Sequence, residues 1–310
     1  MPLRLDIVVP TYNRPHLIRP LVTVLAGQCL EGDRIFVVWQ GPEPPAPSPS
    51  PVQYLSLGRP NLPAARNRGF KESHADIVLF LDDDVVPAPD LVSRHRACYS
   101  DPEVAGVAGY VDDPIFIRER PRPSIIDLSR GDCVQNFACS VSQKTASAMG
   151  ANMSFRKSAL AAIGGFDEHF KRNALWEEVD CCLRLLAAGN TLWYCADAKV
   201  KHCREDKGGC RGDRNRYGYL YHQFANTAYF ALRFAEPENY GLWFTFWKYR
   251  LEYYSRIKRG RDFLAVAAGM AGAAGGIARF FGSLAWGSPR RKRIDRAALQ
   301  KTLVALGSEG

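Results

Sequence analysis

Short apolar runs alternate with amphipathic segments through the first half of the chain. The apolar runs are rich in Val, Ile and Leu, as is typical of strands, and they span Ile7–Val9, Ile35–Trp39, Tyr54–Leu57 and Ile77–Leu81. The segments Pro15–Ala26 and Ala64–Ser73, which lie between them, have a helical composition. Because strands that alternate with helices form parallel sheets with helices on both faces, the pattern predicts an α/β fold.

The second half of the chain begins less regularly. A further strand is predicted at Val104–Val111, and the region 112–147 that follows it is rich in Arg, Pro, Asp and Ser. A loop of that length inside a compact domain is usually functional. Glu177–Ala188 is predicted to be a helix, because its apolar residues recur at helical spacing up to a Gly-Asn stop. Two short strand ends follow, at Leu192–Cys195 and Lys199–His202.

The last third has a different character. The chain beyond residue 218 is helical in composition, and eight aromatic residues fall between positions 240 and 254. The run 263–278 carries no charge, but it has only 16 residues, of which eleven are Ala or Gly. A spanning helix needs about 20 predominantly apolar residues, so this run predicts a poor one. We expect two units, a first domain over 1–217 and a helical, basic region over 218–310.

Composition and charge exclude several classes of protein. Over 310 residues, 46% are hydrophobic and 24% are charged, which excludes wholesale disorder and coiled coil. The nine cysteines do not form a disulfide pattern and the N-terminus does not resemble a signal peptide, so we expect a cytoplasmic protein. The net charge is +9, yet residues 1–198 carry −3 and residues 199–310 carry +12. Nucleic acid is therefore not favoured as a partner, and the basic last third indicates a second partner of another kind.

Polar residues follow the predicted strands where α/β sheets bind ligands, at the carboxyl ends. Pro10–Arg14 follows the first strand, Gln40 the second and Asp82–Asp84 the fourth. Three adjacent carboxylates repel one another unless a cation or hydrogen-bond donors offset them. Hard oxygen ligands suit Mg²⁺ or Mn²⁺, and the alternative is a solvated acidic turn that caps the next helix.

A second acidic group opens the helix at Glu177. Glu177, Glu178 and Asp180 fall in its first turn, where the helix dipole alone favours acids, and the functional alternative is a general base. His202 follows a short strand, and could be structural or a metal ligand. The cysteines around it match no paired zinc pattern, and the chain contains neither a Rossmann GxGxxG nor a P-loop.

Five motifs stand in an order that resembles one known family. They are PTYNR (Pro10–Arg14), NLPAARNRG (Asn61–Gly69), LDDDVVP (Leu81–Pro87), GANMSFRKSAL (Gly150–Leu160) with GGFDE (Gly164–Glu168), and WEEVDCCLRLLAAG (Trp176–Gly189). Together they resemble family 2 glycosyltransferases, over about residues 5 to 216. The resemblance implies the GT-A fold, a mostly parallel sheet flanked by helices, with a C-terminal helical region added here.

The resemblance also implies roles for individual residues. The nucleotide and sugar would be bound by Pro10, Thr11, Asn13, Gln40, Arg66, Asp82, Asp83 and Arg211, with Asp82 and Asp83 at the ribose and Arg211 in a lid over the diphosphate. Asp84 and His202 would hold the metal, Mg²⁺ or Mn²⁺, and Glu178 would be the catalytic base. Two positions depart from the family pattern, because Gln40 stands where an acid usually reads the base and Glu178 where Asp is usual.

The expected function is therefore inverting transfer of a sugar from a nucleoside-diphosphate sugar to a hydroxyl of a glycan or lipid-linked acceptor. The aromatic and basic residues of segment 240–293 favour a peripheral contact with an anionic membrane, and their alternative is a subdomain packed on the catalytic unit. Two other functions remain open at this point. One is a non-catalytic GT-A-like adaptor that binds membrane or nucleic acid through its basic tail, and the other is a nucleotidyltransferase.

Overall fold

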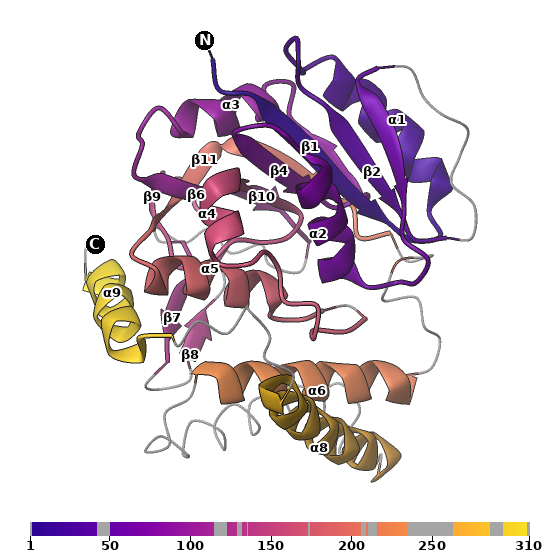
Figure 1. The fold of residues 1–310 in the computed structure, drawn as a ribbon, viewed down its shortest axis with the longest axis vertical. Coiled ribbons are helices and arrows are strands. Elements are labelled where there is room, and N and C mark those ends of the chain that lie inside the picture. Colours follow the sequence, from indigo (N-terminus) through magenta and orange to yellow (C-terminus); the bar gives the residue numbers. More distant parts are fainter. Residues whose placement is uncertain are drawn as a thin grey trace.

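A mixed β-sheet runs through the centre of the molecule, with helices on both faces (Figure 1). The protein is seen in a computed structural model, which describes residues 2–41, 50–114, 123–128, 132–134, 136–172, 174–205, 209, 216–234, 263–285 and 294–308. Within these residues the strands of the sheet lie in the order β3-β2-β1-β4-β10-β6-β11-β5, and β9 pairs with β11. The expected α/β fold with a C-terminal helical region is confirmed.

The strands of the first half run parallel to one another, except the three-residue strand Val85–Pro87, which runs in the opposite direction. Their bounds are β1 Leu5–Thr11, β2 Ile35–Trp39, β3 Val52–Ser56, β4 Ile77–Leu81, β5 Val85–Pro87 and β6 Val104–Asp112, followed by β9 Gln143–Lys144, β10 Asn152–Arg156 and β11 Thr191–His202. β1 pairs in parallel with both β2 and β4, so the residues after these three strands emerge at one edge of the sheet. β10 lies antiparallel between β4 and β6, and this makes the sheet mixed.

Helices cover the two faces and bury the alternate residues of each strand. Their bounds are α1 Pro15–Ala26, α2 Leu62–Glu72, α3 Leu91–Cys98, α4 Lys157–Ala162, α5 Glu177–Ala187, α6 Arg216–Phe234, α8 Phe263–Ala285 and α9 Arg296–Ser308. Residues of α1 and α3 pack with Ile7 and Leu79 on one face. Residues of α2, α4 and α5 pack with Val8 and Phe80 on the other. This alternation is the period of two that β-strands impose on their side chains.

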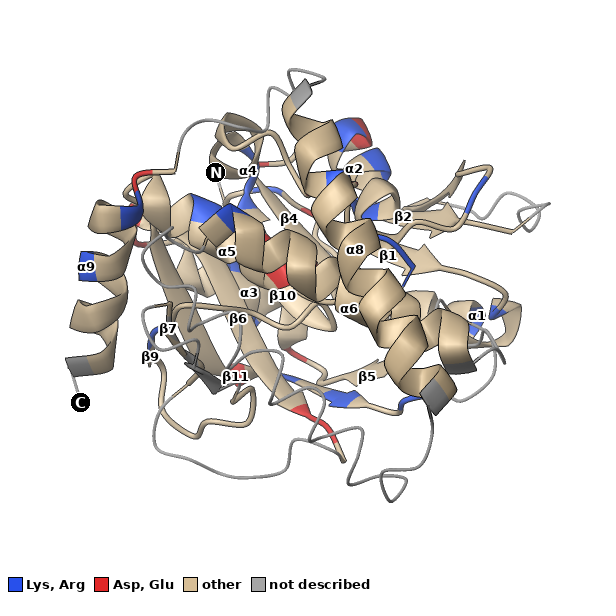
Figure 2. Cartoon of the chain, turned by 90° about the horizontal axis from the view of Figure 1, so that it is seen from below, with Lys and Arg blue, Asp and Glu red and all other residues tan. Residues whose placement is uncertain are grey.

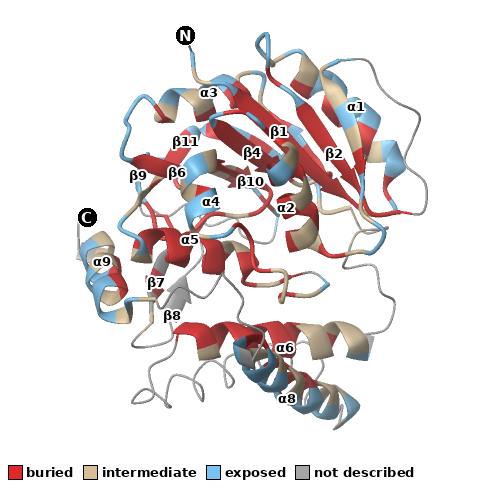
Figure 3. Cartoon of the chain, viewed as in Figure 1, coloured by how far each residue is buried: buried red, intermediate tan, exposed pale blue. Residues whose placement is uncertain are grey.

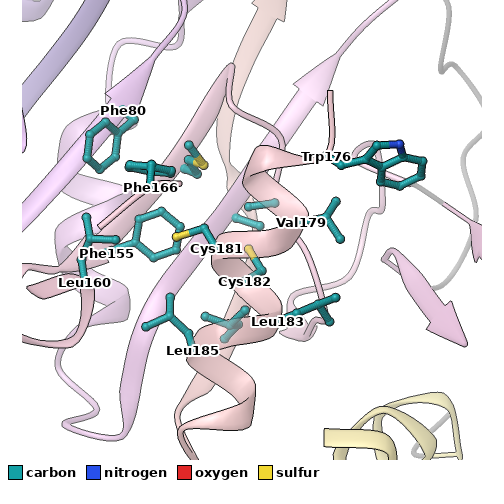
Figure 4. Packing of buried hydrophobic residues seen from close by; sticks show 14 of the residues in the cluster. Phe80, Phe155, Leu160, Phe166, Trp176, Val179, Cys181, Cys182, Leu183 and Leu185 are labelled. Atoms are coloured by element: carbon teal, nitrogen blue, oxygen red, sulfur yellow. The ribbon is translucent and has the colours of Figure 1, made fainter. Parts of the chain in front are cut away.

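The core beside α5 is aromatic. Figure 4 shows Phe80, Phe155 and Phe166 close together beside the buried face of α5, which carries Cys181 and Cys182. The rings of Phe80 and Phe166 meet edge to face, with centroids 5.0 Å apart. The cysteines of α5 are free and fully buried, as expected for core thiols. The first turn of α5, which carries the acidic group, is thus held by a rigid core at its back.

Three elements differ from the sequence predictions. Asn152–Arg156, predicted only as a motif, forms the central strand β10, and its alternation of buried polar and apolar residues hides a strand pattern. The two predicted strand ends are one strand, β11, whose pairing with β6 shifts register between Cys195 and Lys199. The irregular region 112–147 contains β9 and a two-stranded sheet, β7 Ile125–Asp127 and β8 Asp132–Val134.

Helices α6 and α8 form a further layer below the sheet in Figure 1, and α9 lies at the side, against α5 and β7. α6 is buried along most of its length, because α5 and the loop before it cover one side and α8 packs on the other (Figure 3). Among the described residues, one helix is long and apolar enough to cross a membrane, Leu264–Leu284 in α8. The aromatic segment 240–254 and the basic group Arg290–Arg293 lie outside the described residues.

Candidate active site

The predicted site residues converge at the carboxyl ends of the parallel strands. Thr11 ends β1, Gln40 follows β2, and Asp82–Asp84 follows β4. The N-terminus of α5 brings in Glu177 and Glu178, and the end of β11 brings in His202. Residues far apart in the sequence thereby surround one acidic centre, at the edge of the sheet where α/β folds bind ligands.

The acidic centre has a ligand set that fits a divalent metal. Asp82, Asp84 and His202 each offer one ligand atom, and these atoms lie within 4.8 Å of one another. Two carboxylate oxygens with one imidazole nitrogen suit Mn²⁺. The two oxygens also suit Mg²⁺, which prefers oxygen ligands. Asp84 and His202 were predicted as ligands. Asp82, expected at the ribose, lies with them in this cluster.

A second carboxylate orients His202. His202 Nδ1 lies 2.7 Å from Asp113 Oδ2, and Nε2 lies 3.1 Å from Asp84 Oδ1. Asp113 is also fixed by Arg204, whose Nε donates to both of its oxygens. Burial acts to lower the pKa of His202, but the hydrogen bonds to Asp113 and Asp84 outweigh it and raise that pKa to about 9. The carboxylate behind the imidazole is the arrangement that holds metal-binding histidines in place.

Arg14 offsets the negative charge of two acids of the triplet, Asp83 and Asp84. Its Nη1 donates to Asp83 at 2.8 Å and to Asp84 at 3.0 Å, and its Nη2 donates to the Glu205 carbonyl at 2.5 Å. Asp83 also accepts a hydrogen bond of 2.7 Å from the Thr11 hydroxyl. Burial raises the pKa of Asp83 to about 6, although Arg14 and the hydroxyl act in the opposite direction. Asp83 is thus an internal partner of Arg14 and Thr11, which ties β1 to the acidic turn.

Arg66 connects the metal cluster with α5. The arginine is almost fully buried, forms an ion pair with Glu177, and lies 3.2 Å from Asp82 Oδ1 through its Nη2. Gly150 makes room for it, since a Cβ at this position would collide with the guanidinium and stand 2.9 Å from Glu178 Oε1. Arg66 was predicted to bind the nucleotide, and the structure adds that it pairs with carboxylates on both sides.

Glu178 has the environment of a general base. It is less buried than Glu177, which is completely enclosed with Arg66. Burial raises the pKa of Glu178 above its ordinary value of 4.5, while the charge of Arg66 and the backbone N–H of Gly150 limit the rise. A carboxylate with a raised pKa accepts a proton more readily, as a base for a hydroxyl nucleophile must.

Trp176, the residue before Glu177 and Glu178, is held in place by helix α6. Trp176 has a left-handed backbone, φ 79°, which turns the chain sharply into α5. Its indole N–H donates to the Thr227 hydroxyl at 3.0 Å, and its ring stacks on Phe230, both in α6. An ion-pair network supports the same contact, because Arg233 of α6 binds Asp180 and Asp167. Helix α6 is therefore part of the support of the site.

Two of the sequence motifs are joined by one side chain. Asn67 of NLPAARNRG donates to the carbonyl of Phe166 and accepts from its N–H, both at 2.8 Å, and so clamps the GGFDE turn. Gly165 in that turn has a φ of +76°, and a Cβ there would stand 2.6 Å from Asn67. Asn67 and Gly165 thus depend on one another. The hydrogen bonds of Asn67 also anchor α2, which carries Arg66.

The remaining predicted residues occupy different settings. Pro10 is buried in β1, and Asn13 is exposed with a φ of 57°. The Gln40 amide is buried, and it donates to the Thr11 carbonyl and accepts from the Asn61 N–H at 2.8 Å. Arg211 lies outside the described residues.

Sequence reasoning did not assign roles to Arg14, Asp113 or Gly150. Arg14 stands inside the PTYNR motif, so its sequence signal was present without a role. Asp113 follows strand β6 in the same way that the acidic triplet follows β4. This position at the end of a strand is the sequence signal that could have identified Asp113. Gly150 opens a motif, but only the packed position of Arg66 explains why it has no side chain.

Curated relatives of the chain are sugar-transferring enzymes. A pre-mycofactocin glycosyltransferase of Mycobacterium tuberculosis is 31% identical over 209 residues, which are 63% of this chain and 42% of that protein. An O-antigen chain rhamnosyltransferase of Salmonella typhimurium is 25% identical over 220 residues, 64% of this chain and 66% of that protein. The chain spans less than half the length of the first of these relatives.

Solved structures of sugar transferases share the fold. A mannosyltransferase from Pyrobaculum calidifontis, in complex with GDP-Man and Mn²⁺, matches 99% of this chain and 86% of its own at a TM-score of 0.52 and 17% identity. GalNAc-T7 with UDP, GalNAc and Mn²⁺ matches 73% of this chain and 50% of its own at a TM-score of 0.53 and 12% identity. The GT-A fold expected from the motifs is thereby confirmed.

The alternatives of an adaptor and of a nucleotidyltransferase are not favoured by any of these similarities. The model of the family described as glycosyl transferase family 2 matches residues 6–164, which is half of the chain. Sugar transfer is the activity that its relatives share. This chain belongs to glycosyl transferase family 2.

Proposed function

We propose that the chain is an inverting, metal-dependent glycosyltransferase that acts on a hydroxyl of a lipid-linked or polysaccharide acceptor. The observation that carries the proposal is the convergence of Asp82, Asp84 and His202 with the desolvated Glu178 beside the Arg66 guanidinium. A nucleoside-diphosphate sugar brings a diphosphate that needs cations, and a hydroxyl nucleophile needs a base. The site offers both within one group of residues.

Each residue has a role in this reaction. Asp82, Asp84 and His202 would hold Mg²⁺ or Mn²⁺, which stabilises negative charge on the leaving diphosphate. Glu178 accepts the proton of the acceptor hydroxyl as that oxygen attacks the anomeric carbon, and the carbon–diphosphate bond breaks in the same step. One displacement from the opposite side inverts the anomeric configuration. Arg66 links these two parts, because it pairs with Asp82 and with Glu177, the neighbour of Glu178.

The donor is bound, in this proposal, by the residues that follow β1 and β2. Pro10, Thr11 and Asn13 line the nucleotide with Gln40, and Asp83 fixes Thr11 through its hydroxyl. Arg211 contributes a bidentate contact to the diphosphate, as arginine does with phosphates. The Mn²⁺ and nucleotides named for the structural relatives, GDP-Man and UDP, support a nucleotide-sugar donor.

The test is a panel of UDP-, dTDP- and GDP-sugars with Mn²⁺ or Mg²⁺ and hydroxyl acceptors. We expect one donor to release its nucleoside diphosphate only when metal is present, and the product to have the opposite anomeric configuration by NMR. Glu178→Gln should bind the donor and fail to transfer the sugar. If no donor is turned over and calorimetry detects no binding of any nucleoside diphosphate, the proposal is wrong.

We also propose the organisation and the location of the protein. Residues 1–217 form the catalytic domain, and residues 218–310 form the helical, basic region. The enzyme works in the cytoplasm at the inner face of the cell membrane, where a lipid-linked acceptor is found. The glycan named for the rhamnosyltransferase relative, the O-antigen chain, supports a carbohydrate acceptor.

A further inference from the structure

The outward face of α8 is apolar without interruption. The exposed large residues of this helix are Leu264, Val266, Met270, Ile277, Phe281 and Leu284. The other exposed positions along it are all Ala or Gly. A surface helix of a water-soluble protein normally turns charged and polar residues outward, so the polarity of α8 is reversed. Figure 2 shows α8 lying across α6 with most of its length free of charged residues.

The inward face of α8 carries the small and polar residues. Gly272 lies against the Tyr221 carbonyl and Gly276 against the Ala225 carbonyl of α6, and a Cβ at either glycine would collide with these atoms. Small residues four positions apart allow this close approach, as they do between helices in membranes. Arg279, the charged residue of the helix, also turns inward and donates to the His169 carbonyl and the Asn226 side chain.

Helix α8 is as apolar as a core helix but is much more exposed. Its apolar window, Leu264–Leu284, has a mean hydropathy of 1.5 but is only 22% buried. α6, in contrast, is enclosed between α8 and the catalytic domain (Figure 3). An exposed apolar surface of this kind marks a contact with lipid or with another protein.

The charged residues near α8 indicate a contact with lipid rather than with another protein. The sequence places four basic residues shortly before α8, Arg256, Lys258, Arg259 and Arg261, with one acid, Asp262, and four more begin five residues after its end, Arg290, Arg291, Lys292 and Arg293. Basic residues at both ends of an apolar helix complement the anionic headgroups around a hydrocarbon layer. Two copies of the chain packed face to face through α8 would instead bring these like charges together.

We propose that the outward face of α8 docks on the surface of a bilayer that contains anionic phospholipids. The helix lies flat in the interface, because its other face is committed to α6 and Arg279 is bonded to the catalytic unit. A spanning orientation would break these contacts and draw an arginine into hydrocarbon. The proposal concerns a surface outside the active site, so it stands or falls separately from the proposed reaction.

The test is co-sedimentation of the full chain with vesicles of phosphatidylcholine, with and without phosphatidylglycerol. We expect binding to the anionic vesicles that weakens with added salt. Met270→Glu with Phe281→Glu should weaken it by about tenfold or more, because two carboxylates would enter the apolar interface. Val24→Glu with Val304→Glu is the matched control, since these apolar residues of α1 and α9 are 46% and 60% exposed and should leave binding unchanged.

Four results would overturn the proposal. They are no binding to anionic vesicles, equal binding by both double variants, a dimer in lipid-free sedimentation equilibrium that the α8 substitutions dissociate, and retention in cell membranes after alkaline carbonate extraction. The last two would assign the face to self-association or to a spanning helix. Circular dichroism and the melting temperature, both expected to be unchanged, verify that each variant is folded.

Discussion

Trp176 stacks on Phe230 with ring centroids 5.1 Å apart and an angle of 17° between the planes. The first residue directly precedes the acidic pair of the candidate active site, and the second belongs to α6. The C-terminal helices therefore support the candidate active site, through Trp176 and through the ion pairs of Arg233. Because the backbone of Trp176 is left-handed, its position depends on contacts that hold its side chain.

We expect Thr227→Val to lower the transfer rate without changing donor affinity. The substitution removes the hydroxyl that accepts the Trp176 indole N–H and costs about 1 kcal/mol of stability. The N-terminus of α5 then moves more freely, which reduces kcat through Glu178. Steady-state kinetics with donor KM as the second readout measures this, and Thr23→Val, at an exposed hydroxyl of α1, is the control. Equal kcat values for the two variants would contradict the coupling.

The two adjacent glutamates should respond in opposite directions when each is changed to Gln. The pKa of Glu178 is raised by burial, so its ionised form lowers stability at neutral pH. Glu178→Gln should therefore raise the melting temperature at pH 7 and abolish transfer. Glu177→Gln removes one partner of the buried Arg66 pair and should lower stability, by about 3 kcal/mol.

The effect of Glu178 on the stability of the fold should change with pH in a defined direction. The destabilisation is absent below the ordinary pKa of 4.5 and grows as pH rises through the higher folded-state pKa. The advantage of Glu178→Gln in melting temperature should therefore shrink as pH falls toward 4.5. In the unmodified enzyme, kcat should fall on the acid side with a pKa above that value. An advantage that grows on acidification would contradict the assignment.

Gly150→Ala should impair the site and the fold together. The added methyl group collides with the Arg66 guanidinium, at the nitrogen that contacts Asp82, and approaches Glu178 Oε1, so the arginine must shift away from its present contacts. We expect a loss of transfer and a stability decrease on the order of 1–3 kcal/mol, as for overpacked sites. Gly58→Ala is the control, because nothing lies within 4 Å of its added Cβ. Thermal unfolding and turnover of the two variants, side by side, decide the point.

Asp113→Asn should weaken metal binding without removing a metal ligand. Asp113 holds the Nδ1 side of His202, and loss of such a partner typically costs about 10–100-fold in metal affinity. Titration with Mn²⁺, followed by electron paramagnetic resonance, measures the affinity directly. Asp112→Asn changes the neighbouring exposed residue and should have no effect. An affinity unchanged in Asp113→Asn would show that His202 does not depend on it.

The sequence predicted the parts of the fold that carry a regular pattern. Ile77–Leu81 and Pro15–Ala26 have the predicted bounds, because a continuous apolar run and a helical stripe are local signals. β10 was missed because its buried Asn152 and Ser154 bond to His95, so polar residues stand where a strand pattern expects apolar ones. The predicted apolar run 263–278 ended before Arg279, yet α8 continues to Ala285. The inward hydrogen bonds of Arg279 make its charge compatible with the apolar outer face.

The sequence motifs name candidate site residues one by one, but not the network that these residues form. The acidic triplet, Glu178 and His202 could be named from motifs, and the structure brings these three groups to one edge of the sheet. Which carboxylate pairs with which cation depends on contacts across more than a hundred residues, as between Arg66 and Glu177. No local pattern encodes such a pairing. Asp83 illustrates this, since only the folded chain shows it bound to Arg14 and Thr11.

The order of strands in the sheet also determines how the chain can assemble during its synthesis. β4 pairs with β1 on one side, but its other neighbour, β10, is translated only after residue 151, and β6 and β11 join the sheet through β10. At ribosomal rates of about 5–20 residues per second, translation from Leu81 to Arg156 takes roughly 4–15 s. During that interval the wholly apolar strand Ile77–Leu81 presents an open edge, which is a template for aggregation. The longest exposure of an unpaired edge of this sheet therefore falls while residues 82–156 are being made.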